Sequence, residues 1–446
     1  MSWAPWADLP PSSLLLDFAQ LGTAWVRGPG DVTLRPRLLS SFWNFARASS
    51  ATRVNAAGQI ELVGNNVARI DHDPVTLQPR GLLIEGQRTN LLLNSLINGT
   101  SLVTQSVTVT AAAHTLSFYG TGTVTVSGTH SATVVGTGAY PARTTLTFTP
   151  SAGTLTVTVS GMVQFAQLEV GAFASSFIPT GASQVTRVAD SATVTGANFS
   201  AWYNQAEGTF FVDTHPSSTT TLQGVFAAND GTADNRIDFR SQGAGFLNAT
   251  GVQQASYSVA GMVPASSNRV AVAYAVGSLA ASRNGGPLSI QAPPLLPINT
   301  QFVVGGVNSG DPRLFGTIRR IRYWPTRLTN AQLQTITGPY PVTVLDAASA
   351  GSLPLSGSAS TVAIAAALAS GDLAFSGSAQ ADVIAAATAQ GALPIAGTAA
   401  ATSIMVASAA GDLPLDGESD AEVFLLPDPL IVFTVEAENR AFAVTR

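Results

Sequence analysis

Asp71, His72 and Asp73 stand next to one another and combine two carboxylates with an imidazole. These groups are common ligands of divalent metal ions, so the triplet is a candidate metal site. The alternation of a β-strand would send neighbouring side chains to opposite faces, however, and Pro74 begins a sequence typical of a turn. The triplet therefore allows two interpretations, a metal cluster and a structural turn.

Catalytic groups are the next possibility. Glycoside hydrolysis needs two carboxylates in one groove, and no pair with the spacing Glu-x-Asp-x-x-Glu occurs on a predicted strand. No Gly-x-Ser-x-Gly elbow stands between a strand and a helix, calcium-binding Gly-Gly-x-Gly-x-Asp repeats are missing, and the chain has no cysteine. Four acidic residues surround one loop region, where aspartate usually serves turn geometry. They are Glu207, Asp230, Asp234 and Asp238. We predict no catalytic residue, metal or cofactor, and a non-enzymatic protein.

Three further histidines, His114, His130 and His215, are scattered through strand and turn sequence and have no partner nearby in the chain. Core or surface roles are predicted for them. Four arginines gather near residue 320 and resemble an anion site, but alternation puts Arg320 and Arg322 on one face of a strand, with Ile321 and Tyr323 on the other. We predict a solvated or interfacial face. The cluster consists of Arg319, Arg320, Arg322 and Arg327.

A glycan site normally combines an aromatic platform with amide and carboxylate groups at its rim. Six residues near two predicted loops have this chemistry, although loops also place such residues for packing. The predicted glycan-binding residues are Trp202, Tyr203, Asn204, Asn229, Asp230 and Asn235.

The composition excludes several classes of protein. The 446 residues carry a net charge of -5, only 11% are charged, and all 21 basic residues are arginine. Without a basic field the main electrostatic contribution to nucleic-acid affinity is missing, so we predict no nucleic-acid partner. No apolar run is long enough to span a bilayer, and no secretory signal is visible at the start of the chain. We expect a protein that is made in the cytoplasm and does not insert into a membrane.

The elements that must position these residues are predicted to be strands. From residue 101 to about 185, apolar and polar residues alternate between regularly spaced glycine turns, which predicts an antiparallel β-sandwich with Thr and Ser outward. A second β unit follows from 200 to 338. It ends with Thr329-Asn-Ala-Gln332, a capping-box sequence that predicts a short helix with Leu333 and Ile336 on its apolar face.

A repeat array follows near the C-terminus. Four glycines open the same phrase at a spacing of 20 residues, and an apolar position keeps the same period from Val344 through Ile364, Ile384 and Ile404 to Phe424. A fixed period predicts one small unit copied along an axis, with two strands of about eight residues in each copy. Intertwined chains would make the protein an oligomer. The four glycines are Gly351, Gly371, Gly391 and Gly411.

Several linked phrases resemble a segment of tail-fibre and spike proteins of tailed bacteriophages. They are Arg47-Ala-Ser-Ser, Val67-Ala-Arg69-Ile-Asp71-His-Asp73-Pro, Arg80-Gly-Leu-Leu-Ile-Glu85-Gly-Gln-Arg88-Thr-Asn90, Ala166-Gln-Leu-Glu-Val-Gly171, Phe177-Ile-Pro-Thr180 and Val185-Thr-Arg187. The stretch from Trp202 to Phe210, with Ile318 to Trp324 and the closing helix, is similar to a laminin-G-like jelly roll of the concanavalin-A lectin type. The resemblance covers residues 45 to 338 and favours the turn interpretation of Asp71-His72-Asp73.

This resemblance implies a virion structural protein, commonly a homotrimer, whose sandwiches contact neighbouring subunits or a host-surface glycan. We predict an all-β fold of tandem antiparallel β-sandwich and jelly-roll modules, a 20-residue-repeat β array and few short helices. Host adhesion is the favoured function. A purely architectural virion component and a polysaccharide depolymerase are the alternatives. The predicted segments are a docking segment (1–45), a linker and strand region (46–100), a β-sandwich (101–195), the jelly roll (196–340), the repeat array (341–426) and a C-terminal strand (427–446).

Overall fold

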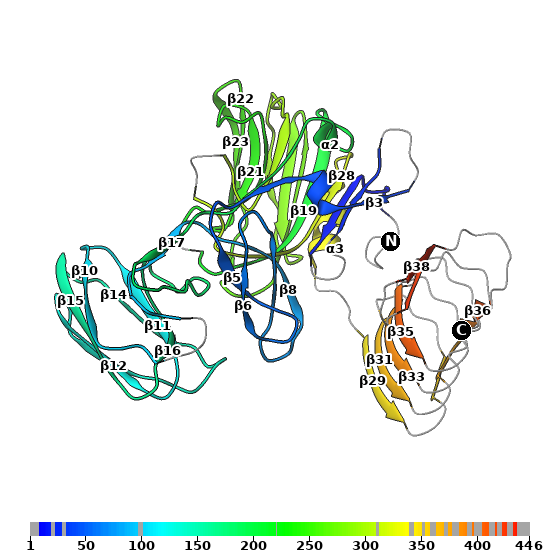
Figure 1. The fold of residues 1–446 in the computed structure, drawn as a ribbon. Helices are drawn as coiled ribbons and strands as arrows, with labels where there is room; N and C mark the ends of the chain where they lie inside the picture. The colour runs from blue at the N-terminus through cyan, green and yellow to red at the C-terminus, as the bar shows by residue number, and fades with distance from the viewer. Residues whose placement is uncertain are drawn as a thin grey trace. The chain divides into compact units, whose positions relative to one another are not determined.

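The computed structural model describes residues 9–18, 23–28, 33–96, 101–219, 221–308 and 312–338, and ten strands beyond residue 338. The chain divides into two compact units, Pro11–Thr337 and a unit that joins Met1–Pro10 to Gly338–Arg446. Strands dominate both units and the helices are short (Figure 1), which confirms the predicted all-β class with sandwich modules. No helix in the described part of the chain has the length and apolar character of a membrane span.

Two antiparallel sheets form the jelly roll. The first contains, in order, β26 (Ser289–Gln291), β25 (Ser278–Arg283), β24 (Asn268–Ala275), β19 (Glu207–Pro216), β28 (Gly316–Trp324), β1 (Leu14–Asp17), β2 (Thr23–Val26) and β3 (Arg35–Arg37), with β8 (Pro79–Ile84) beside β28 and β7 (Arg69–His72) beside β8. The second contains β23 (Val252–Ser258), β22 (Ala244–Ala249), β21 (Arg236–Arg240), β20 (Gly224–Asn229), β27 (Gln301–Val304), β18 (Ser191–Thr195) and β4 (Asn44–Ala46).

Aromatic side chains fill the space between these sheets. Phe210 of β19 stacks on Phe302 of β27 with ring centroids 5.5 Å apart, and Tyr323 of β28 lies 4.8 Å from Phe210. All three are buried in one apolar cluster. Burial of several aromatic rings in a single cluster makes this the main hydrophobic core of the unit.

A smaller β-sandwich has a core of its own. Alternation is clear in β12, where Val124 and Val126 are buried and Thr123 and Thr125 are partly exposed, as the period-two pattern predicts. One sheet contains β10 (Gln105–Val109), β15 (Gly153–Ser160), β12 (Thr123–Gly128) and β13 (Ala132–Val135). The other contains β14 (Thr144–Phe148), β11 (His114–Tyr119) and β16 (Gln164–Val170).

Two short strand pairs connect the modules. The hairpin of β5 (Ala51–Val54) and β6 (Ile60–Val63) precedes β7, and β9 (Arg88–Asn90) pairs with β17 (Val185–Arg187) on either side of the small sandwich in the sequence. The small sandwich is thus an insertion between β9 and β17.

Six strands within the predicted docking and linker segments, β1, β2, β3, β4, β7 and β8, belong to the two sheets of the jelly roll. Strand β1 pairs with β28, with Asp17 opposite Arg320, and β4 pairs with β18 at the edge of the second sheet. Strands β7 and β8 extend the first sheet. The buried residues Leu14 and Leu16 supply apolar area to the main core, which explains why the Leu-rich start of the chain folds here.

Three short helices accompany the strands: α1 (Leu39–Phe42), α2 (Ala197–Ser200) and α3 (Asn330–Thr337). The capping box predicted for α3 is present. Gln332 N donates to Thr329 Oγ1 at 3.2 Å, and Thr329 N donates to Gln332 Oε1 at 2.8 Å. Leu333 and Ile336 are buried, as predicted from their spacing.

The repeats contribute strands to two parallel sheets. Val344 pairs with Ile364, Ile364 with Ile384 and Ile384 with Ile404, so neighbouring copies align with the 20-residue period. Each copy supplies one longer and one shorter strand rather than two of about eight residues. The first sheet contains β29 (Thr343–Ser349), β31 (Ala363–Ala369), β33 (Val383–Ala389), β35 (Ile404–Ala409), β37 (Glu422–Leu425) and β38 (Ile431–Thr434), and the second β30 (Leu353–Ser356), β32 (Leu373–Ser376), β34 (Ile395–Ala396) and β36 (Leu415–Asp416).

The last copy departs from the predicted register. Phe424 pairs with Val406, not with Ile404, which instead lies opposite Glu422. Strand β38 then pairs antiparallel with β37 and ends the parallel stack. The loops of the array lie outside the described residues.

Candidate functional site

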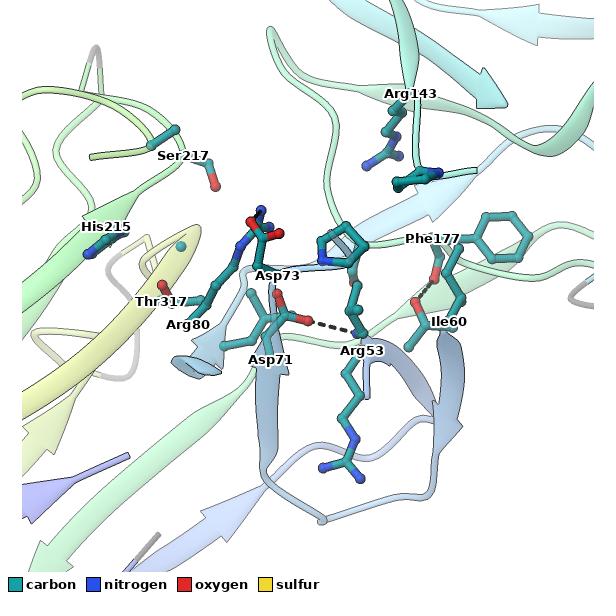
Figure 2. A pocket seen from close by; sticks show the side chains of 18 of the residues that line it. Arg53, Ile60, Asp71, Asp73, Arg80, Arg143, Phe177, His215, Ser217 and Thr317 are labelled. Atoms are coloured by element: carbon teal, nitrogen blue, oxygen red, sulfur yellow. Dashed lines mark hydrogen bonds and ion pairs between the residues drawn. The ribbon is translucent and has the colours of Figure 1, made fainter. Parts of the chain in front are cut away.

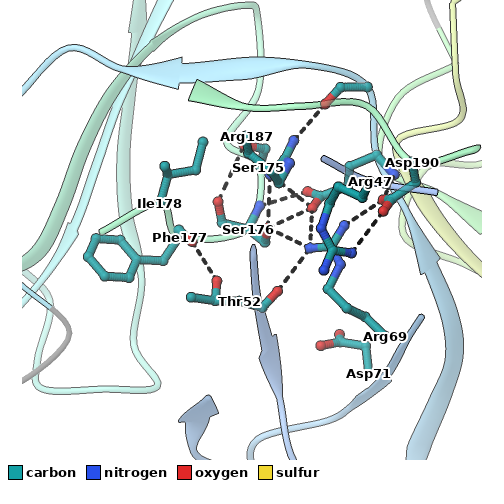
Figure 3. A network of polar contacts seen from close by, with 12 residues as sticks. Arg47, Thr52, Arg69, Asp71, Ser175, Ser176, Phe177, Ile178, Arg187 and Asp190 are labelled. Carbon is teal, nitrogen blue, oxygen red and sulfur yellow. Dashed lines mark hydrogen bonds and ion pairs between the residues drawn. The ribbon is translucent and has the colours of Figure 1, made fainter. Parts of the chain in front are cut away.

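A buried ion network joins the phrases that carry the sequence resemblance (Figure 3). Arg69 donates to Asp190 at 2.6 Å and to Glu85 at 2.8 Å, Arg47 donates to Asp190 at 3.0 Å, and an Arg187 nitrogen lies 2.9 Å from Glu85. None of these side chains is more than 4% exposed. The five residues come from segments on both sides of the small sandwich, so the network ties the insertion points together.

The segment that follows β16 completes the network. Ser176 donates to Glu85 through its backbone N at 2.7 Å and through Oγ at 2.6 Å, while Glu169 accepts from Ser175 N at 2.8 Å. Burial opposes the ionisation of Glu85, but the charges of Arg187 and Arg69 and the bonds from Ser176 outweigh it and lower its pKa to about 2. The charge of Glu85 is therefore balanced and its oxygens are engaged in hydrogen bonds, so this carboxylate has a structural role.

Beside this network lies a cavity of about 610 Å³, which we name the junction cavity (Figure 2). Its first wall comes from β5 to β8 and the turn between β7 and β8, with Arg53, Asp71, Asp73 and Arg80 among its residues. The second wall belongs to the small sandwich and the segment after β16. The third belongs to the jelly roll. The second wall includes Tyr119, Tyr140, Arg143 and Phe177, and the third includes His215, Ser217, Thr317 and Arg319.

Direct hydrogen bonds hold the first two walls together. Tyr140 donates its hydroxyl to the carbonyl of Gly58 at 2.7 Å, and Thr52 donates to the carbonyl of Phe177 at 2.5 Å. Within the second wall, Arg143 donates to the carbonyl of Ser175 at 2.7 Å. Hydrogen bonds within and between the first two walls thus fix the backbone segments that carry the lining residues.

The pKa values of the two aspartates of the first wall are shifted in opposite directions. Burial raises the pKa of Asp71 to about 6, against the effect of the Val54 N–H, which donates to Oδ1 at 2.8 Å. Asp73 has its pKa held well below the ordinary range by the N–H groups of Thr76 and Val75 and by Arg80. Asp73 therefore caps the turn, as the turn interpretation of the triplet predicts. Among the described residues, no group of three or more metal-ligating side chains gathers.

The third wall is basic. Burial lowers the pKa of His215; Asp213 opposes this effect, while the charges of Arg319 and Arg80 add to it. Arg319, Arg80 and His215 all line the junction cavity. Within the described part of the chain, Arg319 has no ion-pair partner, whereas Arg80 holds Asp73 at 2.8 Å.

The aromatic pair predicted to form a glycan platform lies in the core instead. Trp202 is 2% exposed and its ring packs 5.0 Å from Tyr323, while Tyr203 is 9% exposed and stacks on Phe199. Both residues follow α2, and their rings belong to the apolar cluster between the sheets. A glycan cannot reach them, so this part of the prediction is wrong.

The polar residues of that prediction serve local structure. Asn229 is fully buried and donates to the carbonyl of Val307, and Asn204 donates to that of Pro325 at 2.8 Å. Asp230 and Asn235 bond to each other at 2.9 Å within one turn and are partly exposed. The structure brings this last pair together, but not with the aromatic residues.

The arginine strand is covered rather than solvated. Arg320 forms an ion pair with Asp17, and Arg322 donates to Ser12 Oγ at 2.9 Å, so the start of the chain covers the face that alternation singled out. Arg327 is bound to the carbonyl of Leu328 and to Asn330 beside α3. Arg319 points to the other face and is the member of the cluster that lines the junction cavity.

Sequence reasoning missed the junction cavity because its walls come from segments more than 200 residues apart. A signal was present: Arg80, Asp71 and Asp73 all lie within phrases singled out by the resemblance. Nothing in the local sequence places them opposite Arg143 or Arg319.

No protein-family model matches the chain, and no curated protein matches it. The K499G mutant of NanB sialidase from Streptococcus pneumoniae is 13% identical, with a TM-score of 0.28 over 33% of this chain and 27% of that one. The Ruminococcus gnavus IT-sialidase CBM40 bound to alpha2,3 sialyllactose is 17% identical, with a TM-score of 0.27 over 30% of this chain and 84% of that one.

Trypanosoma rangeli sialidase in complex with the inhibitor DANA is 12% identical, with a TM-score of 0.26 over 33% of this chain and 26% of that one. The chain thus spans about a quarter of the length of the two sialidases. This chain is thus a distant match to sialidase and CBM40 β-sandwich domains, and no activity of this chain follows from these matches.

Proposed function

We propose that this protein is a glycan-binding structural subunit of a phage fibre or spike, and that it binds a host-surface glycan in the junction cavity. The observation that carries the proposal is the lining of this cavity. Guanidinium, hydroxyl, phenol and carboxyl groups from three walls converge on about 610 Å³, within the size range of small-molecule sites.

The chemistry of the lining suits a saccharide. Tyr140 is half-buried and offers an aromatic surface, while Ser217 and Thr76 are exposed polar residues of the lining, and we call the part of the cavity that they border its mouth. Sugars combine apolar C–H faces with hydroxyls that need directional partners, so mixed aromatic and polar walls favour them. The buried ion network beside the cavity fixes the walls before binding, which lowers the entropy lost on association.

Binding without turnover is favoured by the state of the carboxylates. Asp73 is engaged by two backbone N–H groups and Arg80, and Glu85 by two arginines and Ser176. A glycosidase needs one carboxyl group as proton donor and a second that is free to act as nucleophile or base. Of the three carboxyl groups in the lining, only Asp71 is left, so the cavity lacks the second carboxyl group that this reaction needs.

The virion location rests on the sequence phrases that resemble tail-fibre and spike proteins. In a virion, several copies of one weak site act together, and avidity can exceed the affinity of each site by about 10² to 10⁴. We propose a homotrimer on the same basis. Light scattering of the full chain at micromolar concentration tests this part, and a monomer would contradict it.

The binding test uses the full chain on a glycan array, with sialyllactose included because one distant structural match holds that sugar. Ser217→Trp and Thr76→Trp would fill the mouth of the cavity from two sides, and both should abolish binding. Thr108→Trp is the matched control, because Thr108 is exposed on β10 and lies outside the lining.

Glycan binding that both mouth variants leave unchanged would overturn the proposed site. The absence of glycan binding by the native chain would favour a purely architectural role. Release of shortened saccharides from capsular polysaccharide would favour a depolymerase.

A further inference from the structure

We propose that the glycan of the junction cavity is acidic, and that its anionic group is bound by Arg319 of the jelly-roll wall and Arg80 of the first wall. This inference rests on the proposed function. It starts from the way in which the arginines of this chain are used. Arg47, Arg69 and Arg187 are neutralised by buried carboxylates, and Arg53 pairs with Glu61 at 3.0 Å.

Two cavity arginines differ from these. Arg319 is partly buried and has no ion-pair partner among the described residues. Arg143 donates to two neutral oxygens, the carbonyl of Ser175 at 2.7 Å and Ser117 Oγ at 2.8 Å. Only 11% of the residues in this chain are charged. Two guanidinium groups without a carboxylate partner that line one cavity therefore make the cavity favour an anionic ligand over a neutral one.

A close backbone approach holds β8, which carries Arg80, against β28, which carries Arg319. Strand β8 pairs with β28 through Leu82 and Ile318, and Gly81 follows this pair in the direction of Arg80. A Cβ atom on Gly81 would lie 2.4 Å from the Ile318 carbonyl oxygen and 2.8 Å from the Arg319 Cα, so only glycine fits there. The flanking Arg80 is thereby held against the strand that carries Arg319.

Arg80 keeps donors for a ligand. One of its terminal nitrogens holds Asp73, but a guanidinium has five N–H donors in a planar fork. Two guanidinium groups that line one cavity can bind the oxygens of one carboxylate or sulfate in charge-assisted hydrogen bonds. In Figure 2, Arg80 lies between Asp73 and the jelly-roll residues His215 and Thr317, and Arg143 lies on another wall. The basic wall therefore orients the sugar by its acidic group.

The same geometry predicts a difference between matched sugars. A neutral sugar leaves the charge of the partly buried Arg319 without a counter-charge, whereas an acidic sugar supplies one. The natural probe pairs are sialyllactose against lactose for a carboxylate, and 3′-sulfolactose against lactose for a sulfate. Oligogalacturonate against its methyl ester gives a second carboxylate pair with unchanged sugar rings.

The experiment measures dissociation constants of the full chain for these probes by calorimetry at low and high salt. At least one acidic probe should bind about tenfold or more tightly than its neutral partner, and added salt should weaken only the acidic one. Arg319→Gln should remove this preference, and Arg319→Lys should restore part of it. Arg37→Gln is the control with the same charge change, because Arg37 is exposed on the edge strand β3 outside the cavity.

The sulfate and carboxylate arms distinguish the two sources of charge. Equal binding of acidic and neutral probes that Ser217→Trp abolishes would overturn the acidic class while leaving glycan binding intact. An acidic preference that survives Arg319→Gln would overturn the role of Arg319. If no probe binds in a manner sensitive to the mouth variants, the proposed function fails and this inference fails with it.

Discussion

Arg69 and Asp190 lie 121 positions apart in the sequence and form an ion pair of 2.6 Å in which neither side chain is exposed. The second oxygen of Asp190 accepts from Arg47 at 3.0 Å, and the Glu85 N–H adds a backbone bond at 2.9 Å. One carboxylate therefore fastens the strands before the small sandwich to the segment that follows it. Because Asp190 and Arg69 are fully buried, water cannot take the place of a lost ion-pair partner.

Replacing Asp190 by alanine should lower the free energy of unfolding by about 3–5 kcal/mol, because two buried guanidinium groups lose their shared counter-charge. Urea denaturation followed by intrinsic fluorescence measures the change. The matched control is Glu61→Ala, which breaks the partly exposed pair with Arg53 and should cost about 1 kcal/mol or less. Equal losses in the two variants would contradict the structural role of the network.

The stability of the fold should also depend on pH through Asp71. Burial raises the pKa of this carboxyl from 3.8 to about 6, so between these values the folded chain binds a proton that the unfolded chain has released. The stabilisation from this proton is complete below pH 3.8 and is lost as the pH rises through about 6. Asp71→Asn removes the titration and keeps an acceptor for the Val54 N–H.

The asparagine variant should therefore be more stable than the native chain at pH 7.5, by up to about 3 kcal/mol, with the difference vanishing toward pH 4. Thermal unfolding across this pH range checks the expectation. His72→Gln is a control, because burial is the main cause of the raised pKa of Asp71 and the imidazole is not among the main causes. A difference that does not change with pH would show that packing, not charge, governs the site.

The burial of Trp202 gives a third prediction. Trp202→Ala should lower the free energy of unfolding by about 3–5 kcal/mol, since it leaves a large cavity between the two sheets of the jelly roll. Asp230→Ala, in the partly exposed turn with Asn235, should change it by about 1 kcal/mol or less. Loss of glycan binding in a stable Trp202 variant would contradict the assignment of this ring to the core.

Local patterns of sequence were enough to predict the class of fold. The alternation in β12 and the capping box at Thr329 and Gln332 are reproduced because each depends on residues a few positions apart. The role of the first 45 residues was not predictable in this way. Strand β1 has no period of its own, and its pairing with β28 joins residues about 300 positions apart in the chain, with Leu14 opposite Tyr323.

The candidate site was predictable only in part, for the same reason. Aromatic and amide residues near Trp202 have the chemistry of a glycan platform, but the sequence does not tell whether α2 turns the ring inward. Arg319 belonged to a recognised arginine cluster, yet its neighbours Arg320 and Arg322 are covered by Asp17 and Ser12. Only the three-dimensional arrangement separates the cavity-lining member from the others.

The repeat array makes a prediction about chain length. Strands align between copies with the period of the sequence, as Leu355 pairs with Phe375 and Phe375 with Ile395. Deletion of residues 371–390 removes one whole period and should leave the remaining strands able to pair in the same register. Deletion of residues 371–380 removes half a period, which puts strands of one sheet where those of the other belong.

We therefore expect the 20-residue deletion to give a soluble protein with the native β signal in circular dichroism and a single unfolding transition for the array. The 10-residue deletion should aggregate or lose part of that signal, because unpaired strand edges become available for association. Size-exclusion chromatography with light scattering compares the two variants and the full chain in one measurement. If both deletions behave alike, the period of the sequence does not set the register of the strands, and the parallel stack would be refuted.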